Sequence, residues 1–249
     1  MALDALFFGA HPDDVELTSG GLAALLASHG HAVGIADLTR GEAASRGTPE
    51  VRAREAAEAA KLLGIAERMN LGLPDLGIDR SDHVQLRLVV GAIRTHRPLL
   101  VVAPHHDDAH PDHVEAAHLI ARACYVSGLA RFDAPGERHR PARVIFALYR
   151  TDRPPQLVVD VSAVWERRAA ALAAHRSQLD PLAGEASGGG RVAAATYLTH
   201  PDFLTEVEAR ARSLGALIGA RFGEGYRLRG PFAIHDARLL LGVAAGGTS

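Results

Sequence analysis

Residues 3–16 read Leu-Asp-Ala-Leu-Phe-Phe-Gly-Ala-His-Pro-Asp-Asp-Val-Glu, an apolar run that ends in a cluster of polar side chains. The apolar part, residues 3–9, predicts a buried strand, because strands of parallel sheets are covered on both faces and carry near-continuous apolar residues. Further apolar runs of strand length alternate with amphipathic stretches along the chain. This order predicts an α/β fold, a Rossmann-like and mostly parallel sheet with helices on both faces.

Local signals set the expected element boundaries. Thr48-Pro49 places a capping residue and a proline at a helix start, and Gly64 follows the expected last helical residue. Strands are expected at residues 3–9, 31–38, 68–73, 99–103, 143–149, 157–161 and 232–235. Helices are expected at residues 16–29, 48–63, 81–96, 113–125, 163–178 and 201–222.

The chain of 249 residues is long enough for one large α/β domain, which is predicted over residues 1–249. The Pro- and Gly-containing stretch at residues 134–143 is the best candidate boundary within it, and a long loop is the alternative. Residues from about 135 to 249 then form a C-terminal extension of the same domain. Residues 184–190 are expected to be a glycine-rich loop and residues 244–249 a loose tail.

Composition excludes several classes of protein. The single cysteine, Cys124, excludes a disulfide within the chain and any cysteine-based zinc or iron–sulfur site, so metal chemistry would use the 14 histidines and the carboxylates. The net charge of −2 gives no electrostatic case for binding nucleic acid or an anionic membrane. No apolar run reaches the roughly 18 residues of a membrane span, and no signal peptide is recognisable at the start. The expected location is therefore the cytoplasm.

Polar side chains follow two of the expected strands. Residues 10–16 come directly after the first strand, and residues 105–113 come directly after the strand at 99–103. Ligands bind beyond the carboxyl ends of strands in open parallel sheets. His11, either Asp13 or Asp14, and His113 would supply two imidazoles and a carboxylate, the ligand pattern of a catalytic zinc site. The other aspartate of the pair would then be available as a general base.

The same segments are open to other interpretations. The aspartates could be helix N-caps and the prolines loop punctuation, and for Asp112 a role as cap or as a partner behind the ligands is preferred to ligation. Two histidines and a carboxylate also form the facial triad of non-haem Fe(II) oxygenases, but that chemistry usually uses a double-sheet β fold. The residue types do not separate zinc from iron. His105 and His106 are candidates for lining a pocket, and His110 could reach the site without being a ligand.

The sequence resembles the PIG-L/LmbE-type family of zinc-dependent N-acetylglucosamine deacetylases. Residues 10–14 with Glu16, and His110-Pro111-Asp112-His113, carry the resemblance. Similar segments span most of the chain: residues 38–42, 46–48, 52–64, 70–75, 176–178 and 223–226. They look most like the branch that deacetylates N-acetylglucosaminyl malate in bacillithiol biosynthesis. Ala43-Ala44 and residues 105–108 depart from that branch, and both would border the pocket.

The resemblance implies a role for each matching residue. His11, Asp14 and His113 match ligands of one Zn(II) per chain, with Fe(II) an alternative in the cell, and Asp13 matches the general base. His110, in its protonated form, matches the residue that stabilises the oxyanion. Arg52 matches a position that holds the acidic end of the substrate, and Asp75 one that holds sugar hydroxyls. A homo-oligomer, with a hexamer favoured, is implied as well.

The predicted function is hydrolytic removal of the N-acetyl group from an N-acetylglucosaminyl conjugate, with the L-malate conjugate preferred. The alternatives are a deacetylase or amidase acting on another N-acetylglucosaminide or on a thiol conjugate, and a non-catalytic carbohydrate-binding module on the same fold. Retention of Asp13 and His110, which binding alone would not require, argues against the module. Cys124 is expected to be a small core residue.

Overall fold

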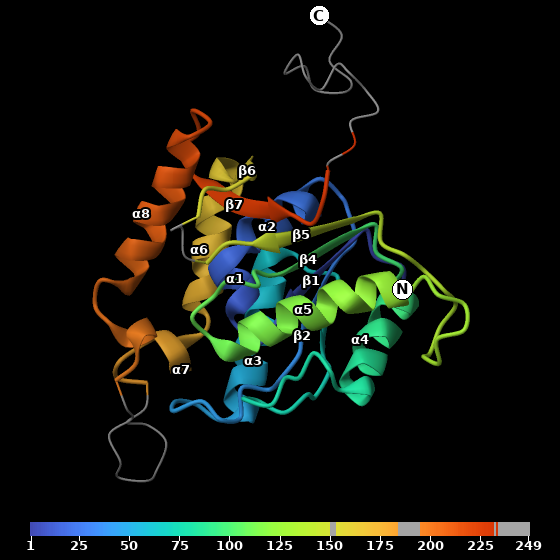
Figure 1. The fold of residues 1–249 in the computed structure, drawn as a ribbon. Coiled ribbons are helices and arrows are strands. Elements are labelled where there is room, and N and C mark those ends of the chain that lie inside the picture. Colours follow the sequence, from blue (N-terminus) through green and yellow to red (C-terminus); the bar gives the residue numbers. More distant parts are fainter. Residues whose placement is uncertain (150–152, 184–194, 232, 234–249) are drawn as a thin grey trace, which may run out of the picture.

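The structure, a computed structural model, describes residues 1–149, 153–183, 195–231 and 233. One sheet of seven strands runs through the described part, with helices on both of its faces (Figure 1). The strands are β1 (Ala5–Gly9), β2 (Val33–Asp37), β3 (Glu67–Asn70), β4 (Leu100–Pro104), β5 (Arg143–Ala147), β6 (Leu157–Asp160) and β7 (Gly223–Leu228). The helices are α1 (Asp14–Thr18), α2 (Gly20–Ser28), α3 (Pro49–Leu63), α4 (His83–His96), α5 (Pro111–Val126), α6 (Trp165–Ala173), α7 (Arg176–Leu179) and α8 (Phe203–Ala216), with short 3-10 turns η1 (Ser162–Val164) and η2 (Tyr197–Thr199).

The strand order places the two polar segments side by side. The order is β3-β2-β1-β4-β5-β7-β6, and the first five strands are parallel. The chain winds outward from β1 to β3 and then returns to β4 on the other side of β1. The carboxyl ends of β1 and β4 therefore meet at the topological switch point, where ligands bind in folds of this kind. The predicted α/β class is confirmed.

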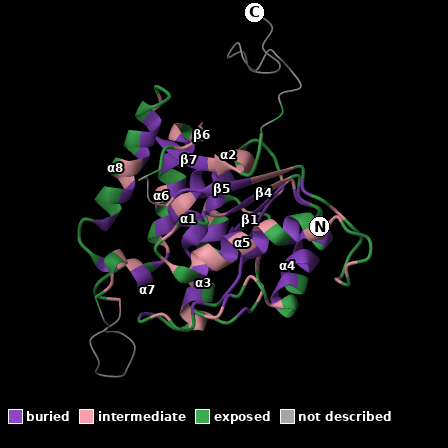
Figure 2. Ribbon diagram, in the orientation of Figure 1, coloured by how far each residue is buried: buried purple, intermediate pink, exposed green. Residues whose placement is uncertain are grey.

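Alternation along the strands divides the core into two clusters. Phe7 of β1 packs with α2, α3, α6 and α8, whereas Leu6 and Phe8 face the opposite way and pack with α4 and α5. Side chains alternate between faces with period two, so a run apolar at every position serves both clusters. Figure 2 shows buried residues along the sheet and on the inner helix faces, with exposed residues outward. The continuous apolar character of residues 3–9 is explained by this double coverage.

The chain departs from the expected elements in three places. The helix expected at residues 16–29 is two helices, α1 and α2, separated at Ser19. The helix expected at residues 163–178 is divided into η1, α6 and α7. Helix α8 ends at Ala216, and the following Gly-Glu-Gly-Tyr segment forms β7, antiparallel to β5 and β6.

Several expected segments cannot be compared with the structure. All but residue 233 of the strand expected at residues 232–235 lies outside the described residues, as do the loop at residues 184–190 and the tail at residues 244–249. Among the described helices, none combines the length and apolarity required to cross a membrane.

Candidate metal and catalytic site

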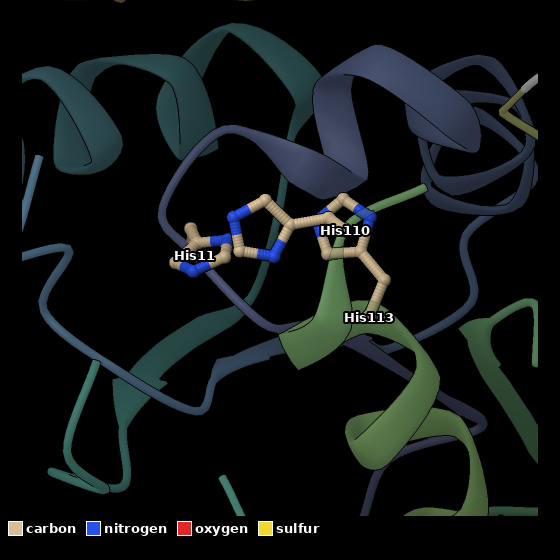
Figure 3. Close-up of side chains that lie close together, drawn as sticks. All are labelled: His11, His110 and His113. Carbon is tan, nitrogen blue, oxygen red and sulfur yellow. The ribbon is translucent and has the colours of Figure 1, made fainter. Parts of the chain in front are cut away.

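Two strand ends and two helix starts position the polar side chains. His11 follows β1 by two residues, and Asp13 and Asp14 lie at the start of α1. From the other segment, His110 is the N-cap of α5 and His113 lies in its first turn. Figure 3 shows the three imidazoles converging, with His110 and His113 from α5 and His11 from the loop facing it. Residues about a hundred positions apart thus form one cluster.

The donor atoms of His11, Asp14 and His113 have the spacing of metal ligands. Asp14 Oδ1 lies 3.2 Å from His113 Nε2, and Asp14 Oδ2 lies 3.6 Å from His11 Nδ1. Neighbouring ligands of a tetrahedral Zn²⁺ at about 2.0–2.1 Å are about 3.3–3.4 Å apart. The His11 backbone N–H also donates to Asp14 Oδ2 at 2.8 Å, which fixes the carboxylate. Each imidazole therefore lies near a different oxygen of the Asp14 carboxylate, and the chemistry of these donors suits a divalent cation.

Carboxylates also face the outer nitrogens of both imidazoles. His113 Nδ1 lies 3.2 Å from Asp108 Oδ1. His11 Nε2 lies 3.1 Å from Asp75 Oδ1 and 3.3 Å from Asp112 Oδ2. A carboxylate at this position fixes the tautomer and orientation of a metal-binding histidine. Asp112 thus acts behind His11, and the cap of α5 is His110.

Two overlapping groups of three possible metal donors occur among the described residues. One group is His11, His110 and His113, and the other is His11, Asp75 and Asp112; in each the donor atoms lie within 4.8 Å of one another. His11 belongs to both groups and Asp14 to neither, so a role for Asp14 as ligand depends on its contacts with His11 and His113. Asp75, expected to hold sugar hydroxyls, also contacts the Ala43 N–H at 2.8 Å.

The adjacent carboxylates Asp13 and Asp14 have opposite electrostatic environments. Burial raises the pKa of Asp13, although the Arg52 guanidinium opposes the increase. Burial also works to raise the pKa of Asp14, but His113 and His11 outweigh it and hold that pKa well below its usual range. Burial alone would lower the pKa of both histidines, yet neighbouring carboxylates raise it to about 12 for His11 and about 10 for His113. Paired carboxylates with divergent pKa values are typical of acid–base sites.

Arg52 points at the expected base. Its Nη2 lies 3.2 Å from Asp13 Oδ1 and donates to the Pro12 carbonyl, and its Nη1 donates to the Gly41 carbonyl. The side chain is almost fully buried. Gly41 has a positive φ of 66°, and a Cβ there would lie 1.9 Å from Arg52 Nη1, so this loop needs glycine to approach the guanidinium. The structure therefore places Arg52 against Asp13, where the sequence predicted a contact with substrate.

His110 has a fixed tautomer. The Asp112 backbone N–H donates to His110 Nδ1 at 3.2 Å, so the ring proton lies on Nε2. Burial, together with the positive charges of His113 and His11, lowers the pKa of His110. The sequence predicted a protonated His110, whereas this environment favours a neutral ring that donates through Nε2–H.

A cavity of about 520 Å³ opens onto these residues. Its lining includes every predicted site residue: His11, Asp13, Asp14, Arg52, Asp75, His110 and His113. Gln178 also lines the cavity and donates to the Arg46 carbonyl. His105 and His106 are not among the lining residues and instead lie against each other and Phe146.

Sequence reasoning gave no role to two buried or half-buried carboxylates, Asp108 near the site and Glu224 below α2. Asp108 contacts His113, and its signal in the sequence is an aspartate five residues before a candidate histidine ligand. Glu224 accepts from the Gly21 and Leu22 N–H groups at the start of α2. It lies in the family-like segment 223–226 but was given no role, because its partners in α2 lie about 200 residues away.

Comparisons with known proteins agree on the family. The profile of PIG-L, described as GlcNAc-PI de-N-acetylase, matches residues 6–125. The 1D-myo-inositol 2-acetamido-2-deoxy-alpha-D-glucopyranoside deacetylase of Saccharomonospora viridis is 30% identical over 227 residues, which cover 70% of this chain and 84% of that protein. The probable N-acetyl-alpha-D-glucosaminyl L-malate deacetylase 2 of Bacillus cereus is 29% identical over 192 residues, covering 69% and 82%.

Among solved structures, a conserved protein of Thermus thermophilus superimposes with a TM-score of 0.81 and 35% identity, covering 93% of this chain and 97% of that one. Sequence, fold and site geometry agree, and the chain belongs to the PIG-L family of de-N-acetylases.

Proposed function

We propose that the protein is a metal-dependent hydrolase that removes the acetyl group from the nitrogen of an N-acetylglucosaminyl conjugate. The observation that carries the proposal is the Asp14 carboxylate between His11 and His113, with Asp13 beside it in the same cavity. The names of two relatives, an inositol-linked and a malate-linked glucosaminide deacetylase, support the substrate class.

His11, Asp14 and His113 would hold the metal. A divalent cation bound there would supply Lewis-acid polarisation of the acetamide carbonyl and would lower the pKa of water. Zn(II) is proposed because two imidazoles and one carboxylate are a frequent catalytic zinc set, and Fe(II) is the alternative that shares these ligands.

Asp13 performs the proton transfers. Its carboxylate takes a proton from the attacking water as the water oxygen bonds to the carbonyl carbon. The carbon–nitrogen bond then breaks, and Asp13 returns the proton to the departing nitrogen. The nitrogen receives one proton of the water through Asp13, and the second proton passes from the acetic acid to the amine. The products are therefore acetate and the protonated amine of glucosamine, one water is consumed, and the protons balance. A raised pKa suits this role, because a group accepts and returns a proton most readily when its pKa is closer to the working pH.

His110 stabilises the developing oxyanion. Its Nε2–H is set as a donor by the Asp112 backbone contact to Nδ1. A donor fixed in advance stabilises negative charge without reorganising during the reaction. This role needs no protonated imidazole.

The test measures acetate and free amine released from a panel of N-acetylglucosaminides that includes the predicted L-malate conjugate and the inositol conjugate. Activity is expected from the metal-loaded protein and should be abolished by a chelator and restored by Zn²⁺ or Fe²⁺. The Asp13→Asn variant should retain the metal, and its kcat should be about 10²–10⁴-fold lower than that of the parent. An active Asp13→Asn protein would reject its role as base.

Two other outcomes would point to the alternative functions. Ligand binding without any acetate release would favour the carbohydrate-binding module. Cleavage of a thiol conjugate in place of every glucosaminide would favour the amidase.

A further inference from the structure

The walls of the catalytic cavity change character from floor to mouth. The metal-site residues at the floor are largely buried, with side chains of His11 and Asp14 each 11% exposed. Leu76 and Tyr197, which line the same cavity, are 65% and 45% exposed and therefore lie at its mouth. The remaining apolar lining toward solvent comes from Ala43, Ala44, Ala109, Pro111, Tyr149 and Leu198. A polar floor is thus continuous with an apolar outer wall.

Leu76 occupies its place at a conformational cost. Its φ is 60°, in the left-handed region that leucine rarely adopts. The conformation is held by its N–H, which donates to Asp112 Oδ2 at 2.8 Å. A single exposed leucine is ordinary on a protein surface. A strained backbone that holds a leucine at the mouth of a catalytic cavity suggests a function for that side chain.

Tyr197 is held rigidly although it is half exposed. Its hydroxyl donates to Glu206 of α8, and its ring lies edge-on to the buried Phe203, with centroids 5.3 Å apart. Tyr149 is restrained in a similar way, because the Arg210 guanidinium lies 4.8 Å from its ring centroid. Rings fixed in this way offer large contact areas with little entropy left to lose on binding.

Among the described residues that line the cavity, cationic side chains that could bind an anionic group outside the metal site are scarce. Arg52 is the only lysine or arginine of this described lining, and the Arg52 guanidinium already contacts Asp13 and two backbone carbonyls. Asp75 and Asp108 add negative charge to the same cavity. Among the described lining residues, an aglycone carboxylate would therefore lose hydration without gaining a free cationic partner.

We infer that the outer wall formed by Leu76, Tyr149 and Tyr197 is an aglycone subsite, and that the preferred substrates are N-acetylglucosaminides with an uncharged apolar or aromatic aglycone. The inference rests on the proposed deacetylase function and departs from the malate conjugate that the sequence favoured. Ala43-Ala44, which departs from the malate branch, lies in the same wall and leaves room for a ring.

The test compares kcat/KM for the methyl, phenyl and L-malate N-acetylglucosaminides of one anomeric form. The phenyl compound should exceed the methyl compound by roughly tenfold, the usual gain from filling an apolar subsite, and should exceed the malate compound by at least as much. Equal or better use of the malate compound would overturn the inference. If none of the three compounds releases acetate, both the proposed function and the subsite are rejected.

Variants separate binding of the aglycone from general damage. Tyr197→Ala and Leu76→Ala should each lower the phenyl-to-methyl ratio of kcat/KM several-fold, because both substrates share the floor and only one reaches the wall. Tyr125→Ala is the matched control, since Tyr125 is 54% exposed and lies outside the cavity. It should leave the ratio unchanged. A ratio unaffected by Tyr197→Ala and Leu76→Ala would reject the subsite.

Discussion

Asp13 and Asp14 are adjacent in the sequence, yet they have different partners. Asp14 lies between two imidazoles, which stabilise its charge. Asp13 lies against Arg52 in a buried position, where desolvation raises its pKa. The environment therefore moves the pKa values of the two carboxylates apart, which supports the proposed roles of Asp14 as ligand and Asp13 as base.

Arg52→Lys tests what the guanidinium does. Lysine keeps the charge but loses the planar fork that reaches Asp13 and two carbonyls together. We expect kcat to fall roughly 10–100-fold with KM nearly unchanged, since misplacement of a catalytic group mainly slows the chemical step. Arg54→Lys, an exposed change in the same helix, is the control. A rise in KM confined to the malate conjugate would instead support the sequence prediction that Arg52 holds an acidic substrate group.

Asp108→Asn tests the support of His113. The amide can no longer accept strongly from the ring N–H, so we expect the Kd for Zn²⁺ to rise about 10–100-fold. Competition with a chromophoric chelator measures this constant. Asp107→Asn is the control, because Asp107 pairs with Arg153 and its side chain is 46% exposed. Equal affinities in the two variants would remove Asp108 from the metal site.

Residue types and spacing predicted most residues of the candidate site, but they did not assign a role to each one. They placed His11, the Asp13–Asp14 pair and His113 together, but they left open which aspartate is the ligand. The difference depends on the direction of each side chain relative to Arg52 and the imidazoles, which the sequence does not contain. The tautomer of His110 likewise depends on one backbone N–H at the start of α5.

At the scale of elements, the break between α1 and α2 is held by distant side chains. Ser19, the N-cap of α2, makes no capping hydrogen bond with its side chain. Glu224 of β7 accepts from the Gly21 and Leu22 N–H groups at 2.7 and 2.8 Å, and Arg168 of α6 donates to the Leu17 carbonyl at 2.8 Å. A Cβ on Gly21 would lie 2.7 Å from Glu224 Oε1, so glycine permits this close approach.

Glu224→Gln should therefore destabilise the protein. Both Glu224 oxygens accept hydrogen bonds, from the Gly21 and Leu22 N–H groups and from the Tyr226 hydroxyl. In glutamine an NH₂ group replaces one of these oxygens, so a donor would then face another donor. A buried donor left without a partner costs about 1–3 kcal/mol. Urea unfolding measures the change. Glu208→Gln, in an exposed pair with Arg212, should stay within about 0.5 kcal/mol of the parent. Equal stability of the two variants would show that Glu224 does not cap α2.

The contacts of Glu224 and Arg168 with the α1–α2 break also explain errors in the predicted element boundaries. Residues 16–29 have the composition of a single helix. The interruption at Ser19 is stabilised by contacts from β7 and α6, so the local sequence carries no sign of it. The strand β7 was missed because its Gly-Glu-Gly start has low strand propensity, and its place is set by packing. A Cβ on Gly223 would lie 2.8 Å from the Gly215 nitrogen of α8, so glycine is required where strand and helix meet.

For the whole molecule, the alternation of strands and helices was sufficient to predict the α/β class and the position of the site. Residues 10–16 and 105–113 follow β1 and β4, and the reversal of winding makes these two strands neighbours. The aglycone wall could not be predicted in this way. Leu76, Tyr149 and Tyr197 come from three separate segments with no shared pattern, and only the packed chain places them on one cavity.

Metal binding should stabilise the whole fold, because its ligands come from segments about a hundred residues apart and meet only in the folded chain. At a free Zn²⁺ concentration of 100 times Kd, linkage gives about 2.7 kcal/mol. For a chain of this size that corresponds to a rise in Tm of roughly 5–10 °C over the chelator-treated protein. Differential scanning calorimetry measures the shift. His200→Ala, an exposed change outside the cavity, should show the full rise, and His113→Ala should show little. If His113→Ala gained as much Tm as His200→Ala, the stabilising metal would be bound elsewhere, and the assignment of His113 as a ligand would fail.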